Sequence, residues 1–499
     1  MNRLVIVSNR VPAPSAAGAQ AGGLAVALES LMDSRGGLWF GWSGRIVDAP
    51  SDKPKRLDSG RTRFATLDLS AEEHERYYNE FSNSTLWPLL HSMPELMTFD
   101  RRNAIVYRAV NQRFADTLVT LLTPGDLIWV HDYHLMCMPA MLRAQGVTAP
   151  IGFFLHIPFP SPDVLASVPE AGPLVHDLLA CDLIGFQTQN DLDNFAEAAV
   201  RLSDAQRLPG GWIGVAGRRV RLGVFPVEIE AREFASVAED AWRSVPAERL
   251  RRSLGGQQLI LGVDRMDPTK GLVQRLAGYR RLLETREHFH RRVTFLQIAA
   301  ESRKDVIAYK DLRNQVEQEA GGINSAFSEP DWTPLRLIAR AGARATMAGY
   351  MREARVGLVT PLRDGMNLVA KEFIAAQDPQ DPGVLVLSRF AGAARQLDSA
   401  VLVNPYDVDE VADAIDAALT MSLPERKARW KAAWAAIEDA SALGWGRSFL
   451  AALLRASASG AERRADATVE QLPVGRMRPA ADLRGSAGSA TPGSSLRII

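Results

Sequence analysis

The segment from residue 359 to 373, VTPLRDGMNLVAKEF, combines charged side chains, a glycine and an expected helix start. An apolar run stops at Pro361, and a helical pattern of apolar residues begins at Leu368. Backbone amides are free at a helix start and can hold a phosphate. Glu372 lies one turn further on, on the face pointing back toward the loop, where a carboxylate can hold sugar or ribose hydroxyls. This pattern favours a nucleotide-sugar; the alternative is an ordinary strand-to-helix turn capped by Asp364.

A second loop with cationic side chains is LGVDRMDPTKGL, residues 261–272, which follows an expected strand and precedes a helix starting near Gly271. Arg265 and Lys270 flank a turn formed by Asp267 and its neighbours. Two cations on one loop can neutralise a diphosphate, because arginine offers a planar fork and lysine a mobile point charge. The alternative is a solvated loop with an incidental ion pair.

Polar residues also follow the expected N-terminal strands. Arg10 ends the first strand in SNR, and Gly22 and Gly23 open a helix, where glycine lets a phosphate approach the backbone amides. In WVHDYHLMCMP, residues 129–139, the HxxH spacing is compatible with a metal site, but no third ligand is evident. A role for Asp132 in binding hydroxyl groups is therefore favoured. His156, at the end of another expected strand, either faces a cleft or is a core histidine.

Two further segments suit a phosphorylated sugar. The stretch YYNEFSNSTLWP, residues 77–88, places Tyr78 and Trp87 on an expected helix and at its end. Aromatic rings can stack on sugar faces and tyrosine hydroxyls can bind phosphate, although such a stripe is also typical of a core. In ESRKDV, residues 301–306, Arg303 follows a strand and is another candidate anion ligand, or else a surface charge.

The elements that must position these residues alternate between short apolar runs and helical patterns, which predicts an α/β fold with parallel sheets. In such sheets ligands bind beyond the carboxyl ends of the strands, where the residues above lie. The expected strands include 3–8, 127–130, 151–155, 183–186, 259–263, 293–298, 356–360, 384–387 and 401–403. Residues 203–221, rich in Gly and Arg, are expected to form a hairpin or a surface loop.

The chain has 499 residues, too many for one compact core, and fits two domains divided near residues 228–234. From residue 456 onward Ala, Ser, Gly, Arg and Pro dominate, which is typical of a disordered tail. Lys and Arg balance Asp and Glu at 58 each, so neither nucleic acid nor a membrane surface is expected as the main partner. No Gly-Lys dipeptide and no GxGxxG after a strand occur, which argues against Walker ATPases and dehydrogenases.

Cys137 and Cys181 have apolar neighbours and are expected to be buried, reduced thiols. No apolar run has the length of a membrane span, and the stretch 4–7 is too short for a signal peptide. These features predict a cytoplasmic protein.

Taken together, the chain resembles the trehalose-6-phosphate synthases, retaining GT-B enzymes of glycosyltransferase family 20. The resemblance is collinear from residue 3 to about residue 420 and is carried by SNR, AGGLAVAL, GLWFGWSG, YYNEFSN with Trp87, HDYHL, GFFLHIPFPS, the Arg265/Lys270 loop and TPLRDGMNLVAKEF. It implies two Rossmann-like parallel-sheet domains facing a central cleft. Residues 1–230 would bind the acceptor and residues 231–455 the nucleotide-sugar, with a tail at 456–499.

The resemblance also implies the reaction: glucose moves with retention from a nucleotide-sugar, by family default UDP-glucose, to glucose 6-phosphate. The product would be α,α-trehalose 6-phosphate. The enzyme would need no cofactor and no metal, and it would form a homo-oligomer, a dimer or tetramer.

The residue roles that the resemblance implies fall into two sets. Arg265 and Lys270 would hold the donor diphosphate, and Glu372 the ribose hydroxyls. Asp364 would hold hydroxyls of the transferred glucose, and His156 would contact that glucose near its 6-hydroxyl. The donor-binding set is Gly22, Gly23, Arg265, Lys270, Asp364, Gly365, Met366, Asn367, Leu368 and Glu372. The acceptor-binding set is Arg10, Tyr78, Trp87, Asp132 and Arg303.

The chain departs from the family pattern in two places. Asp264 and Pro268 replace a glutamate and an aromatic residue, and Glu301 stands two positions before Arg303, where its carboxylate could weaken phosphate capture or alter the acceptor. Two alternatives therefore stay open at this point. One is a related synthase acting on another acceptor such as glycerol phosphate, and the other is a catalytically dead nucleotide-sugar sensor.

Overall fold

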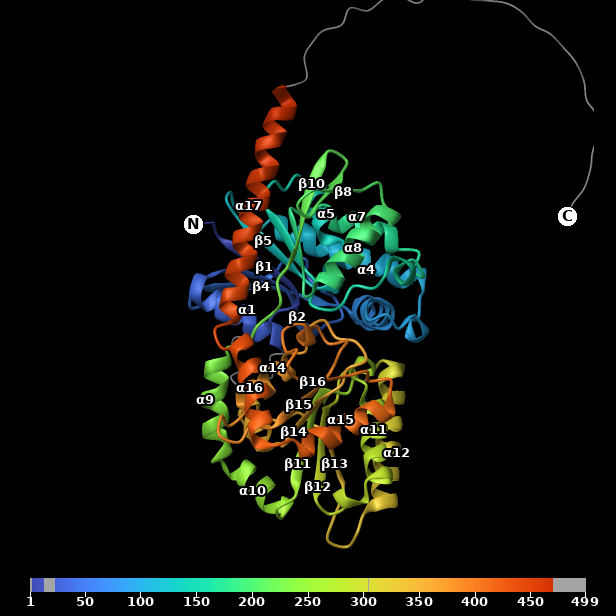
Figure 1. Cartoon of the computed structure of the whole chain (residues 1–499). Helices are drawn as coiled ribbons and strands as arrows, with labels where there is room; N and C mark the ends of the chain where they lie inside the picture. Colours follow the sequence, from blue (N-terminus) through green and yellow to red (C-terminus); the bar gives the residue numbers. More distant parts are fainter. Residues whose placement is uncertain (1, 13–22, 304, 470–499) are drawn as a thin grey trace, which may run out of the picture. The chain divides into compact units, whose positions relative to one another are not determined.

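The structure is a computed structural model that describes residues 2–12, 23–303 and 305–469. The elements discussed below belong to a compact unit that ends at Gly460. Two separate sheets with helices on both faces make up this unit (Figure 1). The fold is therefore α/β with two sheets of mainly parallel strands, as expected.

The first sheet has ten strands in the order β3-β4-β2-β1-β5-β6-β7-β10-β9-β8. Its seven central strands pair in parallel, while β3 and the β8–β9–β10 ribbon add antiparallel edges. The bounds are β1 Leu4–Arg10, β2 Gly37–Ile46, β3 Lys55–Ser59, β4 Thr62–Leu69, β5 Leu127–His131, β6 Ile151–Phe154, β7 Leu183–Phe186, β8 Gln206–Leu208, β9 Trp212–Val215 and β10 Arg218–Val224. The hairpin expected at residues 203–221 is thereby confirmed.

The second sheet has six parallel strands in the order β13-β12-β11-β14-β15-β16. The bounds are β11 Gln258–Arg265, β12 Val293–Ala300, β13 Leu335–Ile338, β14 Val356–Val359, β15 Val384–Ser388 and β16 Val401–Val403. β14 and β15 are buried along their whole length, as in parallel strands covered on both faces.

The α-helices have the following bounds: α1 Gly23–Arg35, α2 Ala71–Glu73, α3 Trp87–Leu90, α4 Arg101–Val119, α5 Met138–Ala144, α6 Pro162–Leu165, α7 Ala171–Leu178, α8 Gln189–Leu202, α9 Ala231–Trp242, α10 Val245–Leu254, α11 Leu272–Thr285, α12 Ile307–Phe327, α13 Arg344–Glu353, α14 Leu368–Ala376, α15 Val408–Thr420, α16 Leu423–Ile437 and α17 Ala442–Val469. Short 3₁₀ turns follow the same naming: η2 Pro94–Leu96, η3 Tyr133–Leu135, η4 Pro268–Lys270, η5 Glu287–Phe289 and η6 Gly392–Arg395. The starts expected for α11 and α14 are confirmed.

The helix expected around residues 77–88 is a π-helix, η1 (His74–Leu86), which continues into α3. Its side-chain hydroxyls follow the wide turn: Ser82 donates to the carbonyl of Tyr77 at 2.7 Å, and Ser84 to that of Asn79 at 2.8 Å. π-turns are rare and concentrate at functional sites. This one carries Tyr78 and ends at Trp87.

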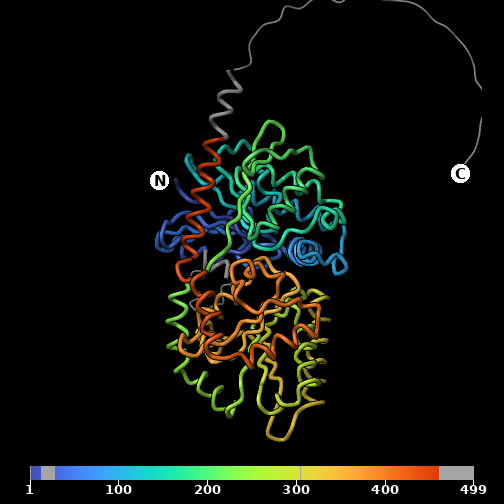
Figure 2. Tube along the Cα trace, viewed as in Figure 1, coloured from blue at the N-terminus to red at the C-terminus, as the bar shows by residue number. Residues whose placement is uncertain are grey.

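Helix α17 packs against the first sheet, although the two are far apart in the sequence (Figure 1). The Phe449 ring stacks on Trp129 with centroids 4.4 Å apart. Gly152 on β6 and Gly185 on β7 make room for that ring, because a Cβ at either position would lie 2.7 Å from a Phe449 ring carbon. In the trace of Figure 2 the chain leaves the first sheet after β10 and returns to it with α17.

α17 extends beyond residue 455, where the tail is expected to begin, and residues 470–499 lie outside the described part. The division into domains at residues 1–230 and 231–455 stays a prediction.

Candidate active site

The loop between β14 and α14 is held on both sides by backbone hydrogen bonds. The Leu362 amide donates to the Thr269 carbonyl at 2.8 Å, and the Asp364 amide to the Phe390 carbonyl at 3.2 Å. Gly365 lies against the end of β6, where a Cβ would be 2.3 Å from the His156 carbonyl oxygen. Only glycine fits there, so the loop packs at Gly365 directly on the backbone of His156, which follows β6 of the first sheet.

Asn367 adopts a left-handed backbone, φ 75°, and caps α14 by accepting the Ala370 amide at 3.3 Å. Its side-chain amide donates to Asp364 at 3.0 Å, which fixes that carboxylate. Asparagine tolerates this backbone better than most residues. Asn367, rather than the Asp364 of the simple-turn alternative, is therefore the cap.

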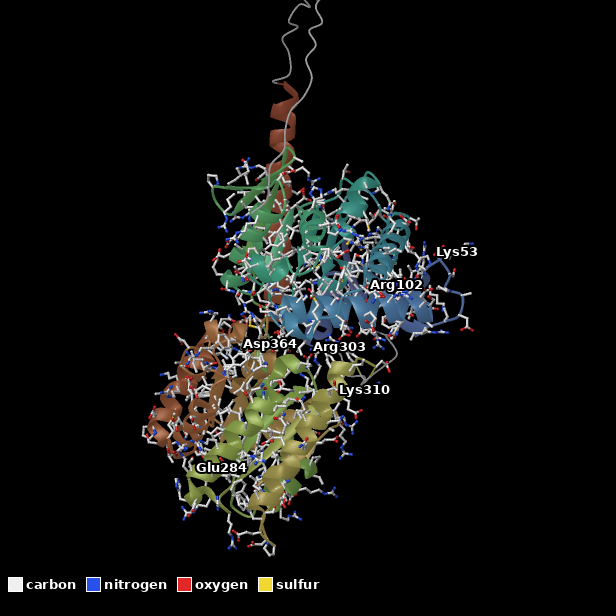
Figure 3. The ribbon with its side chains drawn as sticks, turned by 90° about the vertical axis from the view of Figure 1, so that its right-hand side faces the viewer. Lys53, Arg102, Glu284, Arg303, Lys310 and Asp364 are labelled. Atoms are coloured by element: carbon white, nitrogen blue, oxygen red, sulfur yellow. The ribbon has the colours of Figure 1, made fainter. Side chains whose placement is uncertain are left out.

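Lys270 and Asp364, expected to act on the diphosphate and on the sugar, form an ion pair with each other. Their side chains are only 12% and 14% exposed, so water screens the pair weakly. Figure 3 labels Asp364 and Arg303, which come from the loops before α14 and α12. Lys270, expected to bind the diphosphate, is thus paired with the carboxylate that is expected to hold the sugar.

Asp267 is a buried carboxylate that joins several expected site residues. It accepts hydrogen bonds from Trp87 Nε1 at 3.3 Å and from the Thr269 amide at 3.1 Å, and Arg265 lies 3.5 Å away. Burial alone would raise its pKa, but Arg265, Arg303 and Lys270 outweigh burial and hold the pKa of Asp267 at about 2. It therefore stays ionised and orders the cations around it.

Trp87 lies close to two guanidinium groups. Arg303 lies 4.0 Å and Arg265 5.6 Å from its ring centroid, distances at which cation–π attraction is favourable. Arg303 also donates to the Tyr133 hydroxyl at 3.0 Å and to the Tyr309 hydroxyl. Its backbone has φ 46°, a strained value for arginine, which is typical of functional positions.

The acceptor candidates of the first sheet gather at the carboxyl ends of its strands. The Tyr78 ring stacks on His134 with centroids 5.7 Å apart. Asp132 has a left-handed backbone, φ 74°, and accepts the His156 amide at 3.3 Å. Burial raises the pKa of Asp132 to about 6, although Arg303 and Arg265 act in the opposite direction.

Glu372 and its neighbours flank the loop at the start of α14. Glu372 is half-buried, and burial raises the pKa of its carboxyl to about 7, with Arg344 partly opposing this shift. Among the described residues it makes no hydrogen bond, so its oxygens are available to a ligand. Met366 is buried in the core and Leu368 packs against it, so these two expected donor residues offer backbone rather than side-chain contacts.

One expected residue, Arg10, is not joined to the described part of this cluster. Arg10 is exposed at the end of β1 with its guanidinium beside Gly44, and no hydrogen bond or ion pair among the described residues links it to Arg303. Gly22 lies outside the described residues, and Gly23 is the first residue of α1.

Sequence reasoning missed Tyr133 and Tyr309, the hydroxyl partners of Arg303, and the buried role of Asp267. Tyr133 is in the HDYHL motif and Asp267 in the cationic loop, so position after a strand could have indicated both. Tyr309 is in α12, where only the turn of the chain after β12 brings it to the site.

The departures from the family pattern have local explanations. Asp264 forms a buried ion pair with Arg275 at 2.5 Å, and Arg275 also donates to the Lys270 carbonyl at 3.2 Å, which supports the cationic loop. Glu301 pairs with Arg313, so an arginine offsets its charge beside Arg303.

Other expectations concern metals, thiols and membranes. Within the described ranges, no group of three or more His, Cys, Asp or Glu side chains could hold a metal ion. Cys137 and Cys181 are buried free thiols, as expected. No helix in the described part of the chain is both long and apolar enough to cross a membrane.

Comparison with known proteins shows the family of this chain. The model of glycosyltransferase family 20 matches residues 3–455. A trehalose-6-phosphate synthase from Sinorhizobium fredii is 45% identical over 453 residues, covering 90% of this chain and 98% of the relative.

Two solved structures are similar to this chain in both sequence and fold. An α,α-trehalose-phosphate synthase (UDP-forming) from Burkholderia xenovorans, in complex with glucose-6-phosphate, is 45% identical with a TM-score of 0.88 and covers 91% of this chain and 100% of its own. The Escherichia coli protein bound with UDP-2-fluoro glucose is 42% identical with a TM-score of 0.86 and covers 91% and 99%. The two-sheet fold is GT-B, and the chain belongs to glycosyltransferase family 20.

Proposed function

We propose that this chain is an α,α-trehalose-phosphate synthase that transfers glucose from UDP-glucose to glucose 6-phosphate. One observation carries the proposal beyond family membership. Arg265 and Arg303, which end or follow strands of the second sheet, and Trp87 of α3 gather around the buried carboxylate of Asp267. A nucleotide diphosphate and a sugar phosphate both need such cations. The Glu301–Arg313 pair removes the main reason to expect another acceptor.

In the proposed mechanism the donor diphosphate is bound by Arg265 and Lys270, with the backbone of Gly22, Gly23 and residues 365–368 around it. When the diphosphate arrives, Lys270 exchanges Asp364 for phosphate oxygens. Asp364 is then free to accept the hydroxyls of the transferred glucose. Charge neutralisation in a water-poor site lowers the barrier to departure of the diphosphate.

The acceptor phosphate is proposed to bind Arg303 and Tyr78 beside Trp87, with Arg10 reaching it from β1 and Asp132 on the acceptor hydroxyls. Retention follows from front-face displacement. The bond from the anomeric carbon to the diphosphate oxygen breaks, the acceptor oxygen bonds to the same face, and its proton passes to the departing diphosphate oxygen. The residues supply positioning rather than a covalent nucleophile.

The proposal is tested by measuring UDP release from UDP-glucose with and without glucose 6-phosphate, and by detecting the disaccharide phosphate by mass. Release that depends on glucose 6-phosphate, and that falls at least about 100-fold in Arg265→Ala, is expected. Arg243→Ala, which removes an exposed arginine paired with Glu239, is the matched control and should leave the rate unchanged. Turnover only with glycerol phosphate would refute the acceptor, and donor binding without turnover would indicate a sensor.

Two broader expectations stay proposals. Balanced charge and reduced, buried thiols support a cytoplasmic location. A homo-oligomer, dimer or tetramer, is expected because closed symmetric assemblies are common among enzymes of this kind.

A further inference from the structure

His131, the last residue of β5, touches the candidate sugar-binding histidine. It is fully buried, and its Nδ1 lies 3.0 Å from Nε2 of His156, a hydrogen-bond distance. The His131 ring lies between Trp129, with centroids 4.5 Å apart, and Trp445 of α17, at 6.4 Å. None of the roles proposed above involves His131.

The pair is neutral because burial lowers the pKa of both rings, to about 3 for His156 and well below the ordinary value for His131. A neutral imidazole carries one N–H, so one ring must donate and the other accept across the 3.0 Å contact. Two arrangements are possible, and they place opposite groups toward the substrate.

The buried surroundings of His131 select between these arrangements. Its Nε2 atom is buried and has no hydrogen-bond partner among the described residues. If Nε2 carried the proton, a donor would be buried without an acceptor, which is costly. If Nδ1 carries it, His131 donates to His156 Nε2 and no imidazole N–H of His131 is left unpaired.

The other contacts of His156 hold its backbone and the plane of its ring, but they do not determine which way round the ring lies. Its amide donates to Asp132 at 3.3 Å and its carbonyl accepts the side-chain amide of Gln187 at 3.3 Å. The ring packs on Phe154 and Trp445, with centroids 4.6 and 5.9 Å apart. Packing contacts alone do not distinguish the two nitrogens of the ring, whereas the bond to His131 does.

We infer that His131 is a positioning residue that fixes the ring orientation and tautomer of His156, so that His156 presents Nδ1–H as a donor to a hydroxyl oxygen of the transferred sugar. This inference rests on the proposed function in that it needs His156 to face the donor glucose, near its 6-hydroxyl. A histidine's partner commonly sets which ring nitrogen carries the proton.

The first test needs no turnover. In protein labelled with ¹⁵N-histidine, the His156 signals, assigned by their loss in His156→Asn, should report a protonated Nδ1 and an unprotonated Nε2. A protonated Nε2 would overturn the inference. Because the measurement uses the resting protein, it is independent of whether UDP-glucose and glucose 6-phosphate are the substrates.

The second test measures kcat/KM for UDP-glucose and for its 6-deoxy analogue. His131→Phe, which keeps a buried ring but removes the donor, should lower kcat/KM for UDP-glucose about 10–100-fold. The analogue should be much less affected, so the preference for the 6-hydroxyl collapses. His131→Asn, whose amide N–H can replace Nδ1–H, should retain most of that preference.

Val130→Ala is the matched control, because Val130 is a fully buried neighbour on the opposite face of β5. It should cost stability without changing the preference between the two donors. A preference left intact in a folded His131→Phe protein would overturn the inference. If that variant does not fold, loss of the Nδ1-protonated signal in a folded His131→Asn protein, with the preference unchanged, would overturn it instead.

Discussion

The carboxyl group of Glu372 lies where burial disfavours its charged form. Its pKa of about 7 lies above the ordinary glutamate value because burial removes water from the charged form. A raised carboxyl pKa means that folding favours the protonated form. The contribution of protonated Glu372 to the free energy of unfolding is fully present below the pKa of this carboxyl in the unfolded chain. It is lost as the pH rises through about 7, the pKa in the folded protein.

We therefore expect Glu372→Gln to be more stable than the parent protein at pH 8, by on the order of 1 kcal/mol, with the difference narrowing toward pH 5. The affinity for UDP should fall in this variant, because an amide cannot accept hydrogen bonds from both ribose hydroxyls as a carboxylate does. Thermal unfolding and UDP titration at pH 5.5, 7 and 8.5 would measure both effects. An unchanged melting temperature at pH 8 together with unchanged UDP affinity would contradict this account of Glu372.

Glu301 and Arg313 provide a second prediction at this scale. If Arg313 offsets part of the charge of Glu301, Arg313→Ala should remove that share of the compensation beside the phosphate-binding Arg303 and raise KM for glucose 6-phosphate several-fold. Glu301→Gln should change this KM little, and the double variant should resemble Glu301→Gln. Steady-state kinetics at low salt would test this, since salt screens the partly exposed pair. A KM in Arg313→Ala equal to that of the parent would show that the pairing is irrelevant to the acceptor.

At the residue scale, the sequence predicted best the groups that follow strands within one motif, such as Arg265, Lys270 and Asp364. It could not predict that Lys270 and Asp364 neutralise each other, because 94 residues separate them. The setting of Arg303 also depends on distant residues, since Trp87 and Tyr133 come from the other sheet. Arg10 has the expected residue type and follows a strand, yet among the described residues no hydrogen bond or ion pair joins it to Arg303.

The segment between β10 and α9 is tied to α14 by a buried ion pair. Lys371, fully buried, donates to Glu228 at 2.6 Å and to the Val227 carbonyl at 2.8 Å. Gln396 donates to the second Glu228 oxygen at 2.7 Å. The connection between the two sheets is thus anchored to the helix that carries Glu372.

Removing one partner of this pair should destabilise the protein more than removing both. Lys371→Met leaves the Glu228 charge buried and should cost about 3–5 kcal/mol, whereas the double variant with Glu228→Gln should recover much of that loss. Urea unfolding of the single and double variants would measure the coupling energy. Additive losses would mean that the two side chains do not interact across the connection.

At the scale of elements, the sequence predicted the buried parallel strands well, because such strands are continuous apolar runs. It did not predict β2, whose sequence GLWFGWSGRI contains three glycines, or β13, whose short LRLI includes an arginine. The π-helix could not be distinguished from an α-helix either. Its wide turn depends on packing and on the hydroxyls of Ser82 and Ser84, not on apolar spacing.

For the whole molecule, the alternation of apolar runs and helical patterns predicted parallel sheets, and the position of the polar residues after strands predicted the edge where the site lies. The resemblance to the family implied the same two-sheet architecture. The return of the chain to the first sheet was not predicted, since Trp445, Phe449 and Leu453 follow the second sheet in sequence and local apolar spacing does not indicate which sheet they cover. Gly152 and Gly185, which make room for Phe449, look in sequence like ordinary strand glycines. Their purpose is visible only once the helix is in place.

The packing of Trp445, Phe449 and Leu453 on the first sheet has a consequence for synthesis on the ribosome. The strands they cover emerge early, whereas their cover is translated more than two hundred residues later, after the whole second sheet. Throughout that interval Trp129 and Phe154 belong to an uncovered apolar surface that can bind a chaperone or another nascent chain. The surroundings of the His131–His156 pair are therefore complete only after α17 has been made, and a chain that terminates before α17 lacks Trp445, which packs on both rings.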